Sequence, residues 1–237
     1  MKNYFDIQRL KPNGTLILPL SMSKLHSDQS PIEIYKFLDF FSSKISEISI
    51  DVVFLYTNGL YFNTDENALD VRQKTNFQMI GHTRELRNMI IKNKKFIPQA
   101  FHYLPWDYVL LNATKYKELL DKLKVLKNSN EEFTKYIIAD LGSREKTEAN
   151  INFLLEEITV TYLMRQNLIE FPHTLSNSSG WRLLCYPGNY IYSDVYVYQN
   201  KLLPSKIKAE FSNSFYNIKE KLLYLSLCVY SIGIGFV

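Results

Sequence analysis

With 237 residues, the chain is long enough for one domain of good size, or for one domain with a small appendage. Its 46% hydrophobic and 22% charged residues, with only 8 Gly and 8 Pro, exclude a disordered, collagen-like or solenoid protein, and two cysteines are too few for a disulfide framework. The net charge of +4 is unevenly distributed, because one segment is strongly basic. Between Arg72 and Lys95 lie seven cations and one acid, Glu85, which indicates a polyanionic partner such as nucleic acid; a solvated helix face is the alternative.

The first elements predicted along the chain form a strand–helix–strand unit. Residues 15–20 (TLILPL) are a short apolar run rich in strand formers, and Pro31 opens a stretch in which apolar residues recur at helical spacing. Residues 51–56 (DVVFLY) form an apolar run typical of a strand that is buried on both faces. A strand, a helix and a strand within about forty residues predict a βαβ unit with parallel strands and a right-handed crossover.

Helices are predicted to dominate the middle of the chain, and strands its end. Helical patterns cover residues 66–94, which carry the basic segment, and then residues 115–127, 131–141 and 148–166. Strands are predicted at residues 108–111, 181–186 and 191–198 and within 222–237, and a polar surface loop at 171–180. The helix over 148–166 is expected to be strongly amphipathic, with one apolar side. Since no segment has the composition of a linker, we predict one α/β domain over residues 1–237.

The two ends of the chain bear on its location. The N-terminal residues lack the apolar run of a secretory signal, so we expect a cytoplasmic protein. Residues 222–237 are uncharged, but this stretch is shorter than the ~20 residues that a membrane-spanning helix needs, and Gly233 and Gly235 interrupt it. We therefore predict a buried terminal strand and no stable membrane association, with a weak tail anchor as the alternative.

Several common catalytic motifs are absent from the sequence. Neither a Walker loop nor a G-x-G-x-x-G sequence follows the first strand, so chemistry on nucleoside triphosphates or NAD loses support. A hydrolase with a Ser-His-Asp triad would need a G-x-S-x-G turn, which is also missing. The histidines have no metal-ligand spacing, so no metal site is predicted, and each is interpreted as a surface or loop residue: His26, His82, His102 and His173.

A serine pair, Ser21 and Ser23, comes just after the first predicted strand. Ligands of open α/β sheets bind beyond the carboxyl ends of the strands, so a serine in this place can act as a nucleophile, although most such serines only cap the next element. Further along the chain, Glu157 lies one helical turn after Phe153 and is expected to point toward the core, whereas Glu156 should point elsewhere. A carboxylate held inside a protein binds an ammonium group or transfers protons; an ordinary surface glutamate is the alternative.

The order of these pieces resembles the tRNA-dependent cyclodipeptide synthases, which make a cyclic dipeptide from two aminoacyl-tRNAs. The resemblance extends over about residues 15–200 and is carried by Leu18-Pro19-Leu20-Ser21, Asp51-Val-Val-Phe-Leu55, the basic stretch 72–95, Phe153-x-x-x-Glu157 and Leu184-Cys185-Tyr186-Pro187. Tyr186-Pro187 is similar to the branch of the family with Pro after this tyrosine. The other branch has His there, and Asn where this chain has Lys24. The family often has Tyr where this chain has Phe153.

The resemblance implies a Rossmann-like parallel sheet flanked by helices, similar to the catalytic domains of class I aminoacyl-tRNA synthetases. It implies Ser21 as the nucleophile that carries an aminoacyl group, Glu157 as the residue that binds the α-ammonium group, and Tyr186 as a hydrogen-bonding residue that helps to move protons. No metal or cofactor is implied, because the tRNA ribose already activates the aminoacyl ester. The implied partners are aminoacyl-tRNAs, used by a protein that we expect to be a monomer.

The same resemblance implies two sets of binding residues. Phe153 would lie near the amine of the first aminoacyl group, whose side chain would pack among Ile17, Pro19, Val53 and Leu184, which favours a small or medium aliphatic residue. The tRNA phosphates would contact the cations of the basic helix, Arg84, Arg87, Lys92, Lys94 and Lys95. Two rival functions stay open. A non-catalytic tRNA- or RNA-binding Rossmann-like module would share the basic helix without using Ser21. An enzyme like the class I synthetases would need ATP-binding signatures that this sequence lacks.

Overall fold

The structure is a computed structural model that describes residues 14–44, 50–58, 68–93, 100–165, 182–187, 191–203, 211–217 and 222–226. Its strands are β1 (Gly14–Leu20), β2 (Ile50–Tyr56), β3 (Ala100–Pro105), β4 (Arg182–Tyr186), β5 (Phe211–Asn217) and β6 (Leu222–Ser226). Its helices are the short 3-10 turn η2 (Met22–Lys24), α1 (Pro31–Lys44), α2 (Ala68–Asn93), α3 (Trp106–Leu111), α4 (Tyr116–Ser129), α5 (Glu131–Leu141), α6 (Glu148–Arg165) and α8 (Tyr192–Gln199).

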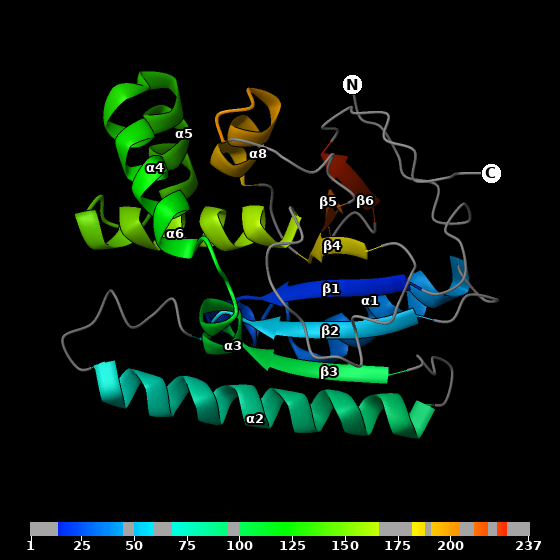
Figure 1. The fold of residues 1–237 in the computed structure, drawn as a ribbon. Coiled ribbons are helices and arrows are strands. Elements are labelled where there is room, and N and C mark those ends of the chain that lie inside the picture. Colours follow the sequence, from blue (N-terminus) through cyan, green and yellow to red (C-terminus); the bar gives the residue numbers. More distant parts are fainter. Residues whose placement is uncertain are drawn as a thin grey trace.

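A mainly parallel sheet organises these elements. The described strands lie in the order β3-β2-β1-β4-β5-β6, and each neighbouring pair is parallel except β5 and β6 (Figure 1). The unit β1-α1-β2 confirms the predicted βαβ unit, since β1 and β2 pair in parallel from Gly14 with Ile50 to Leu20 with Tyr56. The Rossmann-like parallel sheet flanked by helices is therefore confirmed.

Alternating side chains of the central strands build two cores, one on each face of the sheet. Leu16 of β1 lies in a buried cluster with Phe37 of α1 and Leu86 of α2. The next residue, Ile17, points to the opposite face and lies with Val53 of β2 in a second cluster that α4, α5 and α6 complete. Helices thus cover both faces, which explains why β1 and β2 are apolar at consecutive positions and not only at alternate ones.

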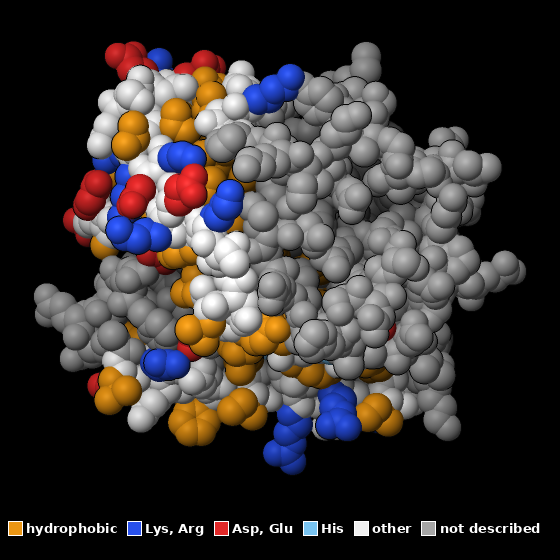
Figure 2. All heavy atoms as spheres, in the orientation of Figure 1, with side chains coloured by type: hydrophobic (Ala, Val, Ile, Leu, Met, Phe, Trp, Pro, Cys, Tyr) orange, Lys and Arg blue, Asp and Glu red, His pale blue; other side chains and the backbone are white. Residues whose placement is uncertain are grey.

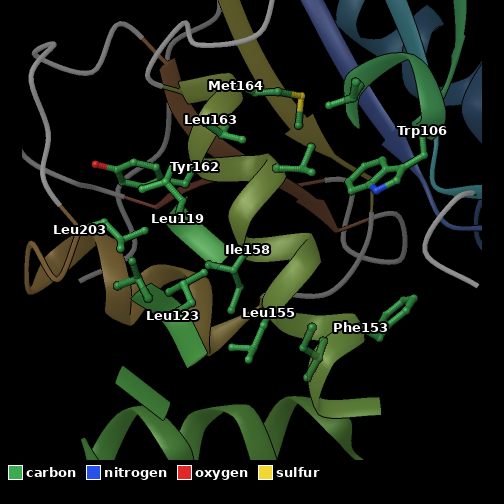
Figure 3. Packing of buried hydrophobic residues seen from close by; sticks show 14 of the residues in the cluster. Trp106, Leu119, Leu123, Phe153, Leu155, Ile158, Tyr162, Leu163, Met164 and Leu203 are labelled. Carbon is green, nitrogen blue, oxygen red and sulfur yellow. The ribbon is translucent and has the colours of Figure 1, made fainter. Parts of the chain in front are cut away.

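Helix α6 is buried on nearly all sides, so the prediction of one apolar side is wrong. Figure 3 shows Leu155, Ile158 and Leu163 of α6 close to Leu119 and Leu123 of α4. Glu157 lies on a narrow stripe of α6 that is only half-buried. The buried residues cover most of the rest of the circumference: Ile151, Phe153, Leu154, Leu155, Glu156, Ile158, Thr159, Val160, Tyr162, Leu163 and Met164. A helix that is enclosed in this way needs apolar residues all round.

The strand order reverses between β1 and β4, because β2 and β3 continue on one side of β1 while β4 and β5 lie on the other. The pairing of β1 with β4 ends at Ile17 and Leu184, although β1 runs on to Leu20 and β4 runs on to Tyr186 in pairing with β5. Pro19 lies in the part of β1 beyond this last pair, where its missing N–H group costs no bond to β4. The carboxyl ends of β1 and β4 therefore diverge, and such a switch point is where open α/β sheets bind ligands.

The third predicted strand is wrong in position. Residues 108–111 lie in helix α3, and the strand is β3, at residues 100–105. Pro105 is the extended N-cap of α3, and the Asn58 side chain accepts a hydrogen bond from the Trp106 N–H at 2.8 Å. Trp106 and Val109, one turn apart, are both buried in the core. Packing at helical spacing thus outweighs the strand preference of the β-branched and aromatic residues here.

The strand predicted at residues 191–198 is also wrong, because these residues form helix α8. Asp140 of α5 supplies the cap: its Oδ1 accepts from the Tyr192 N–H at 2.9 Å, and its Oδ2 accepts from the Ser193 N–H at 2.7 Å. The Tyr196 ring of α8 stacks on Phe133 of α5 with 6.4 Å between ring centroids. A cap and a packing surface that come from another helix cannot be read from the local sequence.

The end of the chain is described in part. Strands β4 and β6 confirm the strands predicted at residues 181–186 and within 222–237, whereas β5 (FSNSFYN) was missed because its sequence has no apolar run. The loop predicted at 171–180 and the residues after 226 lie outside the described residues. None of the helices in the described ranges is long and apolar enough to cross a membrane.

We expect Asp140→Ala to lower the free energy of unfolding by about 1–2 kcal/mol, because helix α8 loses the acceptor for two of its first N–H groups. Asp121→Ala is the matched control: Asp121 is exposed on α4, with an ion pair to Lys117 at 4.0 Å, and its loss should change stability by less than about 0.5 kcal/mol. Urea unfolding followed by circular dichroism measures both. Equal losses in the two variants would contradict the capping role.

Candidate functional site

The candidate site lies at the carboxyl ends of β1 and β4, where the strand order reverses. Ser21 directly follows β1, and Tyr186 and Pro187 end β4, so the fold brings two separately predicted motifs to the same edge of the sheet. The main chain at Ser21 is fixed on three sides. The Leu20 carbonyl accepts from the Thr57 N–H at 2.9 Å, the Ser21 N–H donates to Gln29 Oε1 at 2.6 Å, and the Ser21 carbonyl accepts from the Lys24 N–H at 2.9 Å.

The Ser21 hydroxyl is not used as a helix cap. Ser21 is the N-cap residue of η2, with φ −81° and ψ 125°, but its side chain makes no capping hydrogen bond. Its Oγ lies 3.1 Å from the Oγ of Ser23, and either hydroxyl can be the donor. Ser21 is half-buried and Ser23 is exposed. The alternative that Ser21 only caps the next element is therefore wrong. Its hydroxyl oxygen lies at the switch point and makes no hydrogen bond that caps η2.

Lys24 connects Ser21 to the other predicted residues. It belongs to the same short turn, and its Nζ lies 5.3 Å from the centre of the Tyr186 ring. Burial lowers the pKa of Lys24, and the negative charges of Glu157 and Asp28 act in the opposite direction. The Lys24 ammonium thus lies within electrostatic reach of both Tyr186 and Glu157.

Glu157 of α6 has a strongly perturbed carboxyl group. Burial raises its pKa to about 7; Asp194 and Asp140 raise it further, while Arg144 and Lys24 oppose the rise. Such a carboxyl group exchanges its proton near neutral pH, which is what a general acid or base requires. Two cations and two acids surround this one side chain, so the charge of any bound group would alter its protonation.

The neighbours of Glu157 on α6 differ from expectation in part. Glu156 is also inside the protein, with 8% of its surface exposed, so the prediction that only Glu157 points inward is wrong. The difference between the two is the direction: Glu156 faces Tyr116 at the start of α4, where it helps burial to raise the pKa of the Tyr116 hydroxyl. Phe153 is buried, and the Arg144 guanidinium lies 4.8 Å from the centre of its ring.

The four apolar residues of the expected side-chain pocket occupy neighbouring register positions. Ile17 is in register with Val53 on one side and with Leu184 on the other, and Pro19 follows on the same face of β1. Ile17 and Val53 are fully buried in the cluster that contains α6, and Pro19 is buried. The sheet thus brings these positions together, and Ile17 and Val53 lie in the same core cluster as Phe153.

The predicted basic helix is α2, and its exposed face mixes cations with apolar groups. Arg84, Arg87 and Lys92 are exposed, and Lys94 and Lys95 lie outside the described residues. Arg84 and Arg87 line an open hollow of about 480 Å³ between α2 and Tyr103 of β3. Figure 2 shows blue and orange side chains side by side along the lower edge, where α2 runs in Figure 1. The exposed apolar residues of α2 include Phe77, Ile80 and Ile91. This combination suits the backbone and bases of a nucleic acid.

The interpretation of all histidines as surface or loop residues is wrong for His82. His82 of α2 is buried, with Nδ1 at 2.9 Å from the Tyr56 hydroxyl and Nε2 at 2.8 Å from the Gln29 carbonyl oxygen. His102 is half-buried in β3, His26 is exposed and His173 is outside the described residues. Within the described ranges, no cluster of three or more His, Cys, Asp or Glu side chains could hold a metal ion.

Sequence reasoning missed several residues that the fold brings to this site. Gln29 lies in the turn between η2 and α1, Arg144 in the loop between α5 and α6, and Asp194 in α8. Each interacts with Ser21 or Glu157, and none of them lies in a motif. Asp194 gave one weak signal, because an acid within an apolar aromatic stretch is more often paired than exposed. Lys24 was noticed only as a departure from the pattern of the resembled family.

Comparison with solved structures finds cyclodipeptide synthases. One from Staphylococcus haemolyticus superposes with a TM-score of 0.54 at 14% identity, covering 87% of this chain and 90% of that one. One from Bacillus thermoamylovorans gives 0.53 at 13%, covering 85% and 87%, and one from Fluoribacter dumoffii gives 0.52 at 16%, covering 84% and 87%.

A Mycobacterium tuberculosis protein, whose structure relates cyclodipeptide synthetases to type I tRNA synthetases, gives a TM-score of 0.50 at 14% identity, covering 79% of each chain. By sequence, no protein family and no curated protein matches. The resemblance of the motifs and the likeness of the structures thus agree, although they rest on different observations. The chain has the fold of the cyclodipeptide synthases, which is related to that of the class I aminoacyl-tRNA synthetases.

Proposed function

We propose that this protein is a tRNA-dependent cyclodipeptide synthase that works through an aminoacyl group on Ser21. One observation carries the proposal: Lys24, in the turn that begins at Ser21, lies near both Glu157 and the Tyr186 ring at the switch point of the sheet. The Ser21 hydroxyl makes no capping bond, and the Glu157 carboxyl group has a pKa of about 7. The fold of the neighbouring structures supports the same activity.

The first step is an ester exchange at Ser21. Its Oγ attacks the carbonyl carbon of an aminoacyl-tRNA, the bond from that carbon to the ribose oxygen breaks, and the ribose oxygen leaves with the proton that the serine gives up. One ester replaces another of similar energy, so the step needs no ATP. Covalent catalysis of this kind divides one difficult transfer into easier ones.

Two further attacks complete the product. The α-amine of the residue on Ser21 attacks the ester carbonyl of a second aminoacyl-tRNA, which releases the second tRNA and leaves a dipeptide on Ser21. The α-amine of the second residue then attacks the ester carbonyl at Ser21, which closes the six-membered ring and breaks the bond from that carbonyl to Oγ. The serine hydroxyl regains a proton, and the enzyme is ready for another cycle.

In this proposal, Glu157 controls the charge of the α-amine. As a carboxylate it binds the α-ammonium group, and with a pKa of about 7 it accepts a proton from that group, which makes the amine nucleophilic. The Tyr186 hydroxyl would hydrogen-bond to the reacting groups, and the Lys24 ammonium over its ring keeps positive charge beside the carbonyl oxygen that becomes negative. Phe153 supplies an apolar wall without a hydroxyl.

The basic face of α2 would bind the tRNA. Its exposed Arg84, Arg87 and Lys92 can contact phosphates, and Phe77 offers a ring on which a base can stack. Contacts of this type hold any tRNA, so the choice between tRNAs would depend on the aminoacyl group in the site. Ile17, Pro19, Val53 and Leu184 would set the size of that group.

We expect Ser21→Ala to reduce formation of cyclic dipeptide by more than about 10³-fold, because the covalent step loses its nucleophile. Ser23→Ala is the matched control and should keep most of the activity. Mass spectrometry of medium from bacteria that express each variant measures the product, and radiolabelled aminoacyl-tRNA reports the acyl group on the protein. A label on Ser23, or full tRNA binding with no label on the wild type, would favour a non-catalytic tRNA-binding module.

We expect Glu157→Gln to lower turnover by about 10²-fold or more, because an amide cannot accept the proton of the α-ammonium group. Glu156→Gln should keep most of the activity, since an amide oxygen can still interact with the Tyr116 hydroxyl. Turnover with aminoacyl-tRNA, measured between pH 6 and 8.5, should rise through about pH 7 in the wild type and in the Glu156 variant only. Similar losses in both variants would remove Glu157 from the chemistry.

Stability provides a second measurement on the same Glu157 variant. A carboxyl group whose pKa rises from 4.5 to about 7 on folding binds its proton more tightly in the folded state, so its contribution to stability declines as pH rises between these values. Glu157→Gln should therefore match the wild type near pH 4.5 and become the more stable of the two by pH 8. Glu156→Gln should show no such divergence over this range.

We expect the double variant Arg84→Glu, Arg87→Glu to raise KM for aminoacyl-tRNA. The slope of log KM against log salt concentration should decrease by about 2, which is about one for each lost phosphate contact. Lys124→Glu with Lys135→Glu changes the charge equally on α4 and α5, away from α2 (Figure 1), and is the matched control. Acylation of Ser21 by a small aminoacyl ester without tRNA should be the same in all three proteins. A wild-type salt slope in the α2 variant would place the tRNA surface elsewhere.

A further inference from the structure

Gln29 connects the two strand ends that form the candidate site. It is fully buried, and its side chain reaches both ends: Oε1 accepts from the Ser21 N–H at 2.6 Å, and Nε2 donates to the Pro187 carbonyl at 2.9 Å. Ser21 follows β1 and Pro187 follows β4. Since the pairing of these strands ends at Ile17 and Leu184, the Gln29 amide takes the place of a ladder bond across the switch point.

The orientation of the Gln29 amide is determined by its two partners. The Ser21 N–H can only donate, and the Pro187 carbonyl can only accept, so the oxygen must face Ser21 and the nitrogen must face Pro187. A glutamate in its ionised form has two acceptors and would repel the Pro187 carbonyl. An amide of this length therefore satisfies both strand ends at any pH, whereas a carboxyl group of the same length can do so only when it is protonated.

The main chain of Gln29 is held by a second set of bonds that reaches helix α2. Its N–H donates to the Lys24 carbonyl at 3.0 Å, and its carbonyl oxygen lies 2.8 Å from Nε2 of His82. The Tyr56 hydroxyl lies 2.9 Å from Nδ1 of the same ring and accepts from the Thr83 hydroxyl at 3.0 Å.

This chain of bonds has one direction. The Thr83 hydroxyl donates to Tyr56, Tyr56 donates to His82 Nδ1, and His82 Nε2–H donates to the Gln29 carbonyl, which requires a neutral imidazole. Burial lowers the pKa of His82, in agreement with the neutral form. The chain links Gln29 to the helix that carries Arg84 next to Thr83 on its outer side.

We propose that Gln29 is the positioning residue of the nucleophile: it fixes Ser21 relative to the end of β4, and thereby to Tyr186. This inference rests on the proposed function of Ser21. The Ser21 N–H is already engaged, so it is not free to stabilise the oxyanion, and that task falls to other groups such as Lys24. Without the Gln29 amide, two strand ends that share no ladder bond would move independently, and a displacement of about 1 Å at the reacting atoms costs about 10²-fold in rate.

The test compares Gln29→Glu and Gln29→Asn with the wild type. A protonated glutamic acid has one O–H donor and one C=O acceptor and so reproduces the amide, whereas a carboxylate does not. The measured quantity is the acylation rate at Ser21 in Gln29→Glu divided by the wild-type rate at the same pH. This ratio should be about 10⁻² at pH 8.5 and should rise to more than about 10⁻¹ at pH 5.5. Division by the wild-type rate removes the titration of Glu157, Lys24 and other shared groups.

Gln29→Asn keeps the amide but is one methylene too short to reach both partners, so its rate should stay low at every pH. KM for aminoacyl-tRNA should be unchanged in both variants, because α2 keeps its cations. Gln199→Glu and Gln199→Asn, at an exposed position at the end of α8, are the matched controls and should show no pH-dependent ratio. All rates are measured below the unfolding transition, with an aminoacyl-tRNA and with an aminoacyl p-nitrophenyl ester.

The two substrates separate this proposal from the proposed function. A wild type that is acylated at Ser21 by the p-nitrophenyl ester but not by aminoacyl-tRNA would overturn the proposed function, and the ratio measured with the ester would still decide the role of Gln29. Equal rates in the wild type and the Gln29 variants, or a ratio for Gln29→Glu that does not change with pH, would overturn the positioning role. A wild type that reacts at Ser21 with neither substrate would overturn both.

Discussion

The divergence of β1 and β4 is the constraint on which the site depends. Two parallel strands that paired over their full length would present a closed edge, but here the ladder stops at Ile17 and Leu184 while both strands continue. The end of the ladder costs little free energy at Pro19, because proline has no N–H group that would be left unpaired. Ser21 and Tyr186 lie beyond the last pair, so neither is part of a ladder between β1 and β4.

The second constraint on the candidate site is the set of cations and acids around Glu157 of α6. Burial favours the neutral form of the Glu157 carboxyl group, and the charges of Arg144 and Lys24 hold its pKa down to about 7. The same cations have other partners, since Arg144 lies on the Phe153 ring and Lys24 on the Tyr186 ring. The two aromatic rings therefore help to hold the two cations near Glu157, and a substitution of either ring would change the positions of these charges.

The sequence allowed the βαβ unit and the place of Ser21 at the carboxyl end of its first strand to be predicted, because both depend on local features: apolar runs of strand length, and a serine directly after the first of them. The failures have a common cause. Residues 191–198 form a helix because Asp140, about fifty residues earlier, caps it, and Gln29 holds a carbonyl 158 residues away. Glu156 is buried and Glu157 is half-buried because other elements pack around most of α6, which no periodicity within the helix could reveal. Partners distant in sequence decided each of these features.

Asp140 has a double role that follows from its position between α5 and α8. Its carboxylate caps α8, and the same negative charge contributes to the raised pKa of Glu157. Any exchange of Asp140 for a neutral cap such as Asn or Ser would keep much of the helix but lower the pH at which Glu157 gives up its proton. A substitution at this helix cap would therefore shift the titration of Glu157 while leaving the Glu157 side chain itself unchanged.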